Sequence, residues 1–181
     1  MKIASKIFGL FVFSLFIFRS IKSQQIFFSE NFERNTLDST WHRISGNWHI
    51  ADVPDKKIAP AENGNQYVLS SGGPGLLYLF VDIPATIKAS QVKLSFSYYT
   101  YSKGPAPSIQ FDFYKKNFKD GNKGKLWKAV LPVKGRWMTF SKILKIPAEA
   151  NMVWLTFYET PSTGKVPGSV CFDNVTLSSV P

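Results

Sequence analysis

Aromatic and hydrogen-bonding side chains alternate with buried-type apolar ones in several short segments of this sequence. If the apolar phase of each segment faces a core, the other phase carries rings and polar groups to the opposite face. That second set is Tyr99, Tyr101, Gln110, Asp112, Tyr114, Trp154 and Tyr158. Flat rings stack on the C–H face of a sugar, and amide or carboxylate groups bond its hydroxyls. The pattern therefore predicts a carbohydrate-binding face, unless a long loop such as 53–64 covers the rings and makes them core.

Basic residues gather between positions 115 and 145, where the single acid is Asp120, in a chain of formal charge +10. The candidate basic patch consists of Lys115, Lys116, Lys119, Lys123, Lys125, Lys128, Lys134 and Arg136. Such a patch attracts polyanions, among them sulfated or uronic glycans. The alternative is a solvated, lysine-rich hairpin that keeps edge strands from pairing with neighbours.

The sequence contains no strong candidate for a catalytic site. Glycoside hydrolysis needs two carboxylates across a cleft, but Asp112 and Glu159, the one pair expected on strands, fall on opposite phases. His42 and His49 are flanked by Asp38 and Asp52 only, and no hydrolase, metalloprotease or phosphate-loop motif occurs. We therefore expect a non-catalytic binding domain, with no catalytic residues.

Period-two alternation positions these groups almost everywhere after Gln24, and no segment carries a helical stripe. Turn dipeptides such as Gly104-Pro105 and Asp120-Gly121 separate about ten short strands. This pattern predicts an all-β fold, a two-sheet antiparallel jelly-roll β-sandwich. The expected strands are 27–32, 48–51, 67–70, 76–83, 92–98, 109–114, 125–131, 137–146, 152–158 and 170–177.

The first 23 residues have the layout of a cleavable secretory signal. Lys2 and Lys6 precede an apolar run that ends at Arg19, too short for the ~20 residues of a membrane-spanning helix. We expect residues 1–23 to be removed and 24–181 to form one secreted, extracellular domain. A secreted protein has little occasion to meet nucleic acid, so the expected partner of the basic patch is an acidic glycan or polymer.

Two residues of the closing segment carry covalent chemistry. Cys171 is the single cysteine, so it is either a buried small hydrophobe or the site of an intermolecular disulfide. Asn174-Val175-Thr176 matches the glycosylation sequon. Because Asn174 falls inside an expected strand, glycosylation requires its side chain to face solvent.

Both ends of the chain resemble a known group of domains. The opening Phe28-Ser29-Glu30-Asn31-Phe32-Glu33 and the closing Gly168-Ser169-Val170-Cys171-Phe172-Asp173-Asn174-Val175 are similar to jelly-roll carbohydrate-binding modules, MAM-like domains and cleaved-adhesin domains. Trp41, the Gly46-Asn47-Trp48 turn and Gly135-Arg136-Trp137 add to the likeness. The paired cysteines of MAM domains are missing, which moves the likeness away from that branch.

The resemblance also implies a structural metal. In such sandwiches an acid of the opening motif and the aspartate of the closing motif share a hard cation such as Ca²⁺. Here those residues are Glu33 and Asp173. The alternative is that both carboxylates face solvent or accept backbone hydrogen bonds.

Taken together, the residues favour a secreted, non-catalytic domain that recognises extracellular, acidic carbohydrate. Two alternatives remain. One is a structural or adhesive component of the extracellular matrix, cross-linked through Cys171. The other is a secreted effector that binds a host protein.

Overall fold

The computed structural model describes residues 24–46, 48–52, 64–70, 75–100, 106–115, 126–159 and 170–180. These residues form only strands and connections. The strands are β1 (Ile26–Glu30), β2 (Trp41–Ser45), β3 (Trp48–Asp52), β4 (Gln66–Ser70), β5 (Gly75–Asp82), β6 (Gln91–Thr100), β7 (Ser108–Tyr114), β8 (Trp127–Val130), β9 (Trp137–Lys145), β10 (Met152–Glu159) and β11 (Val170–Val180).

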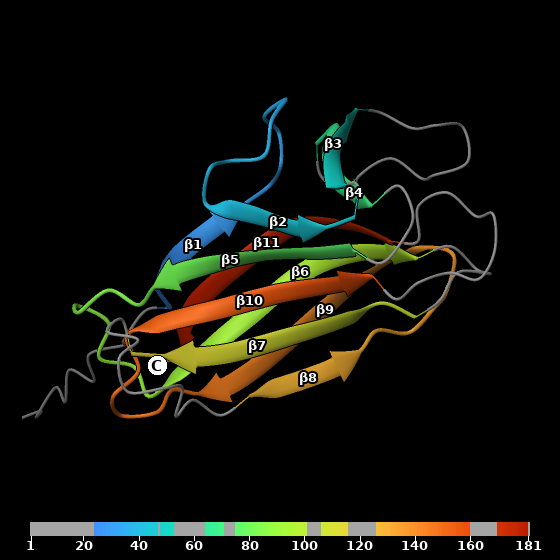
Figure 1. Cartoon of the computed structure of the whole chain (residues 1–181). Helices are drawn as coiled ribbons and strands as arrows, with labels where there is room; N and C mark the ends of the chain where they lie inside the picture. Colours follow the sequence, from blue (N-terminus) through green and yellow to red (C-terminus); the bar gives the residue numbers. More distant parts are fainter. Residues whose placement is uncertain are drawn as a thin grey trace, which may run out of the picture.

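Two antiparallel sheets pack face to face (Figure 1). The six-stranded sheet has the order β3-β4-β11-β6-β9, with β1 also pairing with β11, and the five-stranded sheet has the order β2-β5-β10-β7-β8. Chain neighbours such as β5 and β6 lie in different sheets, so the chain crosses the sandwich repeatedly. The predicted all-β, two-sheet antiparallel sandwich is confirmed.

The core lies between the sheets and consists of the apolar phase of each strand. Leu77 of β5 and Leu155 of β10 are fully buried from the five-stranded sheet, and Leu94 of β6 from the other. Phe157 of β10 and Phe172 of β11 meet across the layers with ring centroids 4.0 Å apart. Burying one such side chain stabilises the fold by about 1.5–3 kcal/mol. Alternation thus decides which side chains of each strand remain on the outer face.

Strand β2 was not predicted from the sequence. Of its five residues only Trp41 is buried, and the other four are exposed. An edge strand with one buried side chain has no apolar alternation to detect. Its position matters because β2 forms one edge of the five-stranded sheet.

Within the described residues, no helix has the length and apolar character needed to cross a membrane.

Candidate functional site

The outer face of the five-stranded sheet carries a continuous group of aromatic rings, which we call the aromatic strip. Its members come from four adjacent strands and are His42, Tyr78, Phe80, Tyr114 and Trp154. They take the outward phase because Leu77, Leu79, Phe113, Val153 and Leu155 take the inward one. His42 is exposed, and the other four side chains are partly exposed. The strip therefore faces solvent in the folded domain.

Trp154 lies at the centre of the aromatic strip. Its ring centroid is 5.5 Å from that of Phe80, 5.9 Å from that of Tyr78 and 5.5 Å from that of Tyr114. His42 extends the group by stacking on Tyr78, with centroids 5.1 Å apart and an interplanar angle of 29°. Tilted and edge-to-face pairs at these distances are the favoured aromatic geometries. The neighbours therefore restrict the orientation of the Trp154 ring.

Hydrogen-bonding groups lie beside the strip on the same face. The Tyr158 hydroxyl donates to Gln110 Oε1 at 2.9 Å, across from β10 to β7. Partial burial raises the pKa of Tyr158, so this hydroxyl keeps its proton. Asp112 is 3% exposed, and its Oδ1 accepts the amide of Phe113 at 3.0 Å. The amide of Gln110 and the carboxylate of Asp112 are thus fixed close to the rings.

One row of side chains crosses all five strands of this sheet. Pairing places His42 opposite Tyr78, Tyr78 opposite Thr156, Thr156 opposite Gln110, and Gln110 opposite Lys128. Directly opposed residues on one face have Cβ atoms about 5 Å apart. An aromatic edge, a polar middle and an exposed lysine therefore lie in line. His42 and Lys128, at the two ends of the row, are exposed, whereas Thr156 and Gln110 in its middle are buried, so a ligand would contact the row at its ends.

The structure brings together most of the residues predicted to form a binding face. Gln110, Asp112, Tyr114, Trp154 and Tyr158 share the outer face of the five-stranded sheet. None of these rings is fully covered, since Tyr114, Trp154 and Tyr158 are partly exposed.

Tyr99 does not belong to this face, and its predicted place there is wrong. It lies on β6 in the six-stranded sheet, where it is 8% exposed. There it packs against Trp137, with ring centroids 5.8 Å apart, next to Tyr67 and Cys171. The phase within its strand was correct, but local alternation does not say which sheet a strand joins. Tyr101 lies outside the described residues.

Three members of the aromatic strip were missed from the sequence: His42, Tyr78 and Phe80. Tyr78 and Phe80 alternate with Leu77, Leu79 and Val81, so the rule used for β7 and β10 would have found them. His42 had no such signal, because β2 itself was not recognised.

The described basic residues do not form one cluster. Lys115 follows the end of β7 and makes an exposed ion pair with Glu149, 3.7 Å from nitrogen to oxygen. Lys134 and Arg136 lie beyond the far end of β8, because β8 runs antiparallel to β7. Lys128 lies between them on the outer face. Lys116, Lys119, Lys123 and Lys125 lie outside the described residues.

The two carboxylates predicted to share a metal have backbone donors. Glu33 Oε1 accepts the amides of Asn65 at 2.8 Å and Gln66 at 3.0 Å. Asp173 is fully buried, and its Oδ1 accepts the amide of Asn174 at 2.7 Å. No group of three or more His, Cys, Asp or Glu side chains suited to a metal ion occurs in the described part of the chain. The calcium site stays a prediction.

Asn174 lies in an irregularity of β11. The pairing of β11 with β6 shifts between Asp173 and Thr176, and Asn174 has a φ of 52°. Its side-chain nitrogen Nδ2 is buried. A glycan needs that nitrogen to face solvent, so the condition set for glycosylation at Asn174 is not met in the folded domain.

Cys171 is fully buried on the outer side of the six-stranded sheet, in contact with Tyr67 and Tyr99. Burial raises the pKa of its thiol far above the ordinary range. A disulfide to a second chain requires an accessible thiolate. The intermolecular bridge considered from the sequence is therefore incompatible with the folded domain, and the buried-hydrophobe alternative holds.

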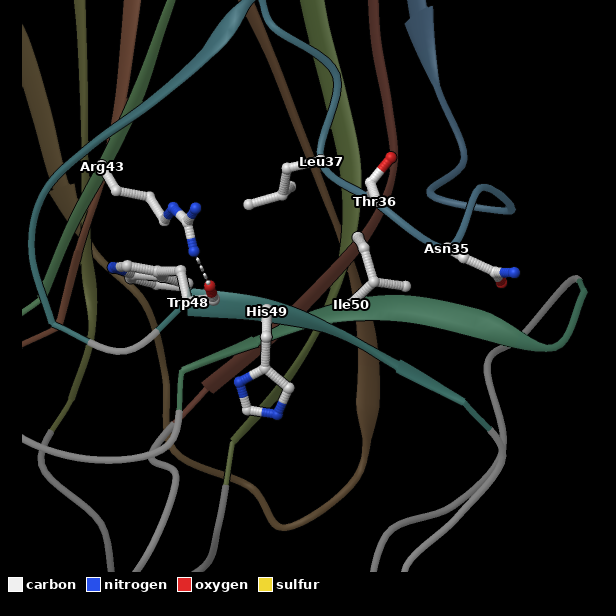
Figure 2. Close-up of a pocket in the computed structure, with 7 residues that line it drawn as sticks. All are labelled: Asn35, Thr36, Leu37, Arg43, Trp48, His49 and Ile50. Carbon is white, nitrogen blue, oxygen red and sulfur yellow. Dashed lines mark hydrogen bonds between the residues drawn. The ribbon is translucent and has the colours of Figure 1, made fainter.

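A small hollow of about 240 Å³ lies between β3 and residues 35–37 (Figure 2). Leu37 and Ile50 point into it, while His49 points away. Arg43 reaches over from β2, and its Nη1 donates to the carbonyl oxygen of Trp48 at 3.0 Å. Because ligand pockets typically hold about 300–1,000 Å³, this hollow is small. The hydrogen bond between Arg43 and Trp48 joins the edges of the two sheets. We therefore assign a structural role to this region.

The fold is that of known carbohydrate-binding and adhesin domains. The CBM22-2 xylan-binding domain of Paenibacillus barcinonensis Xyn10C matches with a TM-score of 0.58 and 18% identity, over 85% of this chain and 99% of that one. The K1 cleaved adhesin domain of Lys-gingipain from Porphyromonas gingivalis W83 matches with a TM-score of 0.57 and 18% identity, over 88% and 99%. The resemblance expected from the two end motifs is thus confirmed for the fold.

A third match is to part of a larger protein. The enzymatically active domain of tailspike protein 4 from bacteriophage CBA120 gives a TM-score of 0.61 at 12% identity, and this chain covers 20% of its length. No protein-family model matches the sequence, and neither does any curated protein. The class defined by fold and face is a jelly-roll β-sandwich with an aromatic outer sheet.

Proposed function

We propose that this protein is a secreted, non-catalytic domain that binds carbohydrate on the outer face of its five-stranded sheet. The observation that carries the proposal is the position of Trp154, which is partly exposed and held by three other rings. A ring already fixed in orientation loses little conformational entropy when a ligand stacks on it. The aromatic strip is therefore suited to a flat, extended saccharide.

The polar groups beside the strip supply the other half of sugar recognition. Gln110 Oε1 accepts the Tyr158 hydroxyl, and this bond fixes both polar side chains beside the aromatic strip, where Tyr158 is partly exposed. His42 adds an exposed imidazole at one edge. Ligand sites commonly combine apolar walls with a few fixed polar groups. This arrangement favours hydroxyl recognition next to ring stacking.

A preference for acidic sugars rests on Lys128. It is exposed and lies directly opposite Gln110 at the β8 edge of the same face. A uronate carboxylate or sulfate bound over Gln110 would lie within reach of its ammonium group. Exposed ion pairs contribute only about 0.2–1 kcal/mol, so charge adjusts selectivity while stacking provides most of the affinity.

The likeness to xylan-binding and adhesin domains supports binding as the general activity. The positions of the carboxylates favour a domain without catalysis. Asp112 and Glu159 point to opposite sides of the five-stranded sheet by alternation, so they do not form a carboxylate pair across one cleft. The competing proposal of a cross-linked matrix component is weakened by the burial of Cys171.

A polysaccharide panel tests the proposal. The domain 24–181 is run in native gels containing neutral or acidic polysaccharides, at low and high salt. We expect retardation by at least one polysaccharide, with retardation by acidic ones reduced at high salt because screening weakens exposed charge pairs. Unchanged mobility in every gel under both conditions would overturn the proposal.

A further inference from the structure

Two similar turns lie side by side at one end of the sandwich. Ile83-Pro84-Ala85 begins the connection from β5 to β6, and Ile146-Pro147-Ala148 begins the connection from β9 to β10. Each connection crosses from one sheet to the other, in opposite directions. Both lie at the end of the sandwich that holds the C-terminus (Figure 1).

Backbone hydrogen bonds make this pair of turns rigid. Within the turns, Ile87 N donates to Pro84 O at 2.9 Å and Ala150 N donates to Pro147 O at 3.0 Å. Between them the bonds are reciprocal. Ile83 N donates to Asn151 O and Ile146 N donates to Ser90 O, each at 2.8 Å. The two connections therefore form one hydrogen-bonded unit whose shape does not depend on a ligand.

A groove of about 740 Å³ runs between these two connections. Its lining is aliphatic apart from one serine and two lysines and comprises Ile83, Ile87, Lys88, Ala89, Ser90, Lys145, Ile146, Pro147, Ala148 and Ala150. Ile83, Ile146 and Ala150 pack directly on the main core. The floor of the groove is thus continuous with the apolar core, and the volume of the groove is one that ligand pockets commonly have.

The charged side chains among the described residues that line the groove are all positive. Lys88 and Lys145 are exposed, and the described residues that line the groove include no acid. Glu149 lies on the second turn, but its carboxylate pairs with Lys115. Asp82, at the end of β5, is an exposed acid outside the lining. Two exposed lysines in an otherwise mainly aliphatic lining complement an anion with an aliphatic tail.

We propose that this groove binds a free, single-chain amphiphile with an anionic head group, such as a long-chain carboxylate. The lining holds no aromatic ring among the described residues, which separates it from the aromatic strip and from sugar stacking. The acyl chain would cover Ile83, Ile146 and Ala150, and the carboxylate would lie between Lys88 and Lys145. This site is independent of the proposed carbohydrate face.

Calorimetric titration with sodium dodecanoate below its micellar concentration tests the proposal. We expect saturable binding by the unmodified domain, and a dissociation constant about tenfold higher for Lys88→Ala/Lys145→Ala, since two exposed charge pairs are lost. Ala148→Phe places a ring in the groove from an exposed position, so it should abolish binding while leaving the melting temperature unchanged. Lys134→Ala/Arg136→Ala removes two positive charges near Thr100, at the other end of β6 from the groove, so it is the matched control and should bind like the unmodified domain.

Three results would overturn the proposal. They are no heat of binding with dodecanoate, equal binding by Lys88→Ala/Lys145→Ala, and binding to vesicles of anionic phospholipid without binding to free dodecanoate. The last result would assign the lysines to a membrane surface instead of a groove ligand. Affinity for polysaccharide should be the same in all four proteins, so this test fails or succeeds separately from the carbohydrate proposal.

Discussion

Trp154 of β10 and Tyr114 of β7 meet on the outer face of the five-stranded sheet, with ring centroids 5.5 Å apart and planes tilted by 47°. Tyr114 pairs in register with Met152, two residues before Trp154, so the contact is a diagonal one between neighbouring strands. Diagonal neighbours are within reach of aromatic side chains. This pair connects the predicted binding residues of both strands into a single surface.

Lys128→Ala should change ligand selectivity without changing the fold. We expect affinity for an acidic polysaccharide to fall about two- to fivefold, because one exposed charge pair is lost, and affinity for a neutral one to stay the same. Native gels at low salt measure both. Lys134→Ala is the control, since it removes an equal charge from beyond the end of β8. An equal loss in both variants would mean that only net charge matters.

Thr156→Val should stabilise the domain. Thr156 is fully buried, and its Oγ1 has no hydrogen-bond partner in the part of the chain that the structure describes. A buried hydroxyl without a partner costs about 1–3 kcal/mol, and valine fills a similar volume. Urea unfolding should show a free energy of unfolding about 1 kcal/mol higher. Thr139→Val, at an exposed position of β9, should change it little, and a loss of stability in Thr156→Val would show that the hydroxyl is satisfied.

Cys171 should make stability depend on alkaline pH. Burial raises the pKa of this thiol in the folded domain, whereas the unfolded chain has the ordinary value of about 8.5. The folded state therefore binds more protons above that pH, and the free energy of unfolding falls by up to about 1.4 kcal/mol per pH unit. Below that pH the contribution is fully present.

Urea unfolding of the domain and of Cys171→Ala between pH 7 and 10, on either side of the thiol pKa of about 8.5, isolates this effect. The buried tyrosines, including Tyr98, whose pKa burial also raises, are common to both proteins. We expect the free energy of unfolding of the unmodified domain to fall relative to that of Cys171→Ala as pH rises. A constant difference over the whole range would mean that Cys171 is not buried as described.

Gly75→Ala should be destabilising because the space beside Gly75 is occupied. A Cβ at this position would lie 2.8 Å from Trp48 Nε1 and 3.2 Å from Glu159 Oε2. Trp48 is fully buried and cannot move aside. We expect a loss of about 1–3 kcal/mol in the free energy of unfolding. Adding Trp48→Phe should make the Gly75→Ala substitution less costly, and additive losses in the double variant would contradict the close contact.

Local alternation predicted most of the outer face. In β7, Ile109, Phe111 and Phe113 are apolar at every second position, which leaves Gln110 and Asp112 outward. That inference needs only the pleat of one strand. The same rule could not assign Tyr99 to a sheet, because partner strands are chosen by long-range packing that no single segment encodes.

The remaining parts of the site depend on contacts between distant segments. His42 reaches the aromatic strip because β2 pairs with β5, although β2 itself has one buried side chain. Glu33 accepts the backbone amides of Asn65 and Gln66; backbone hydrogen bonds were the stated alternative to a metal, but the motifs at the chain ends did not identify these donors. The groove between the two Ile-Pro-Ala turns exists only because β5 and β10 are neighbours in one sheet and β6 and β9 in the other.

The most direct test of carbohydrate binding compares Trp154→Ala with Trp137→Ala on a glycan array. Both variants remove a partly exposed tryptophan, one from the outer face of the five-stranded sheet and the other from that of the six-stranded sheet. At a temperature where circular dichroism shows both to be folded, we expect Trp154→Ala to lose about two- to tenfold in affinity, since one aromatic contact contributes about 0.5–1.5 kcal/mol. Trp137→Ala should bind every glycan that the unmodified domain binds. Unchanged binding by Trp154→Ala, or equal loss in both variants, would contradict the account.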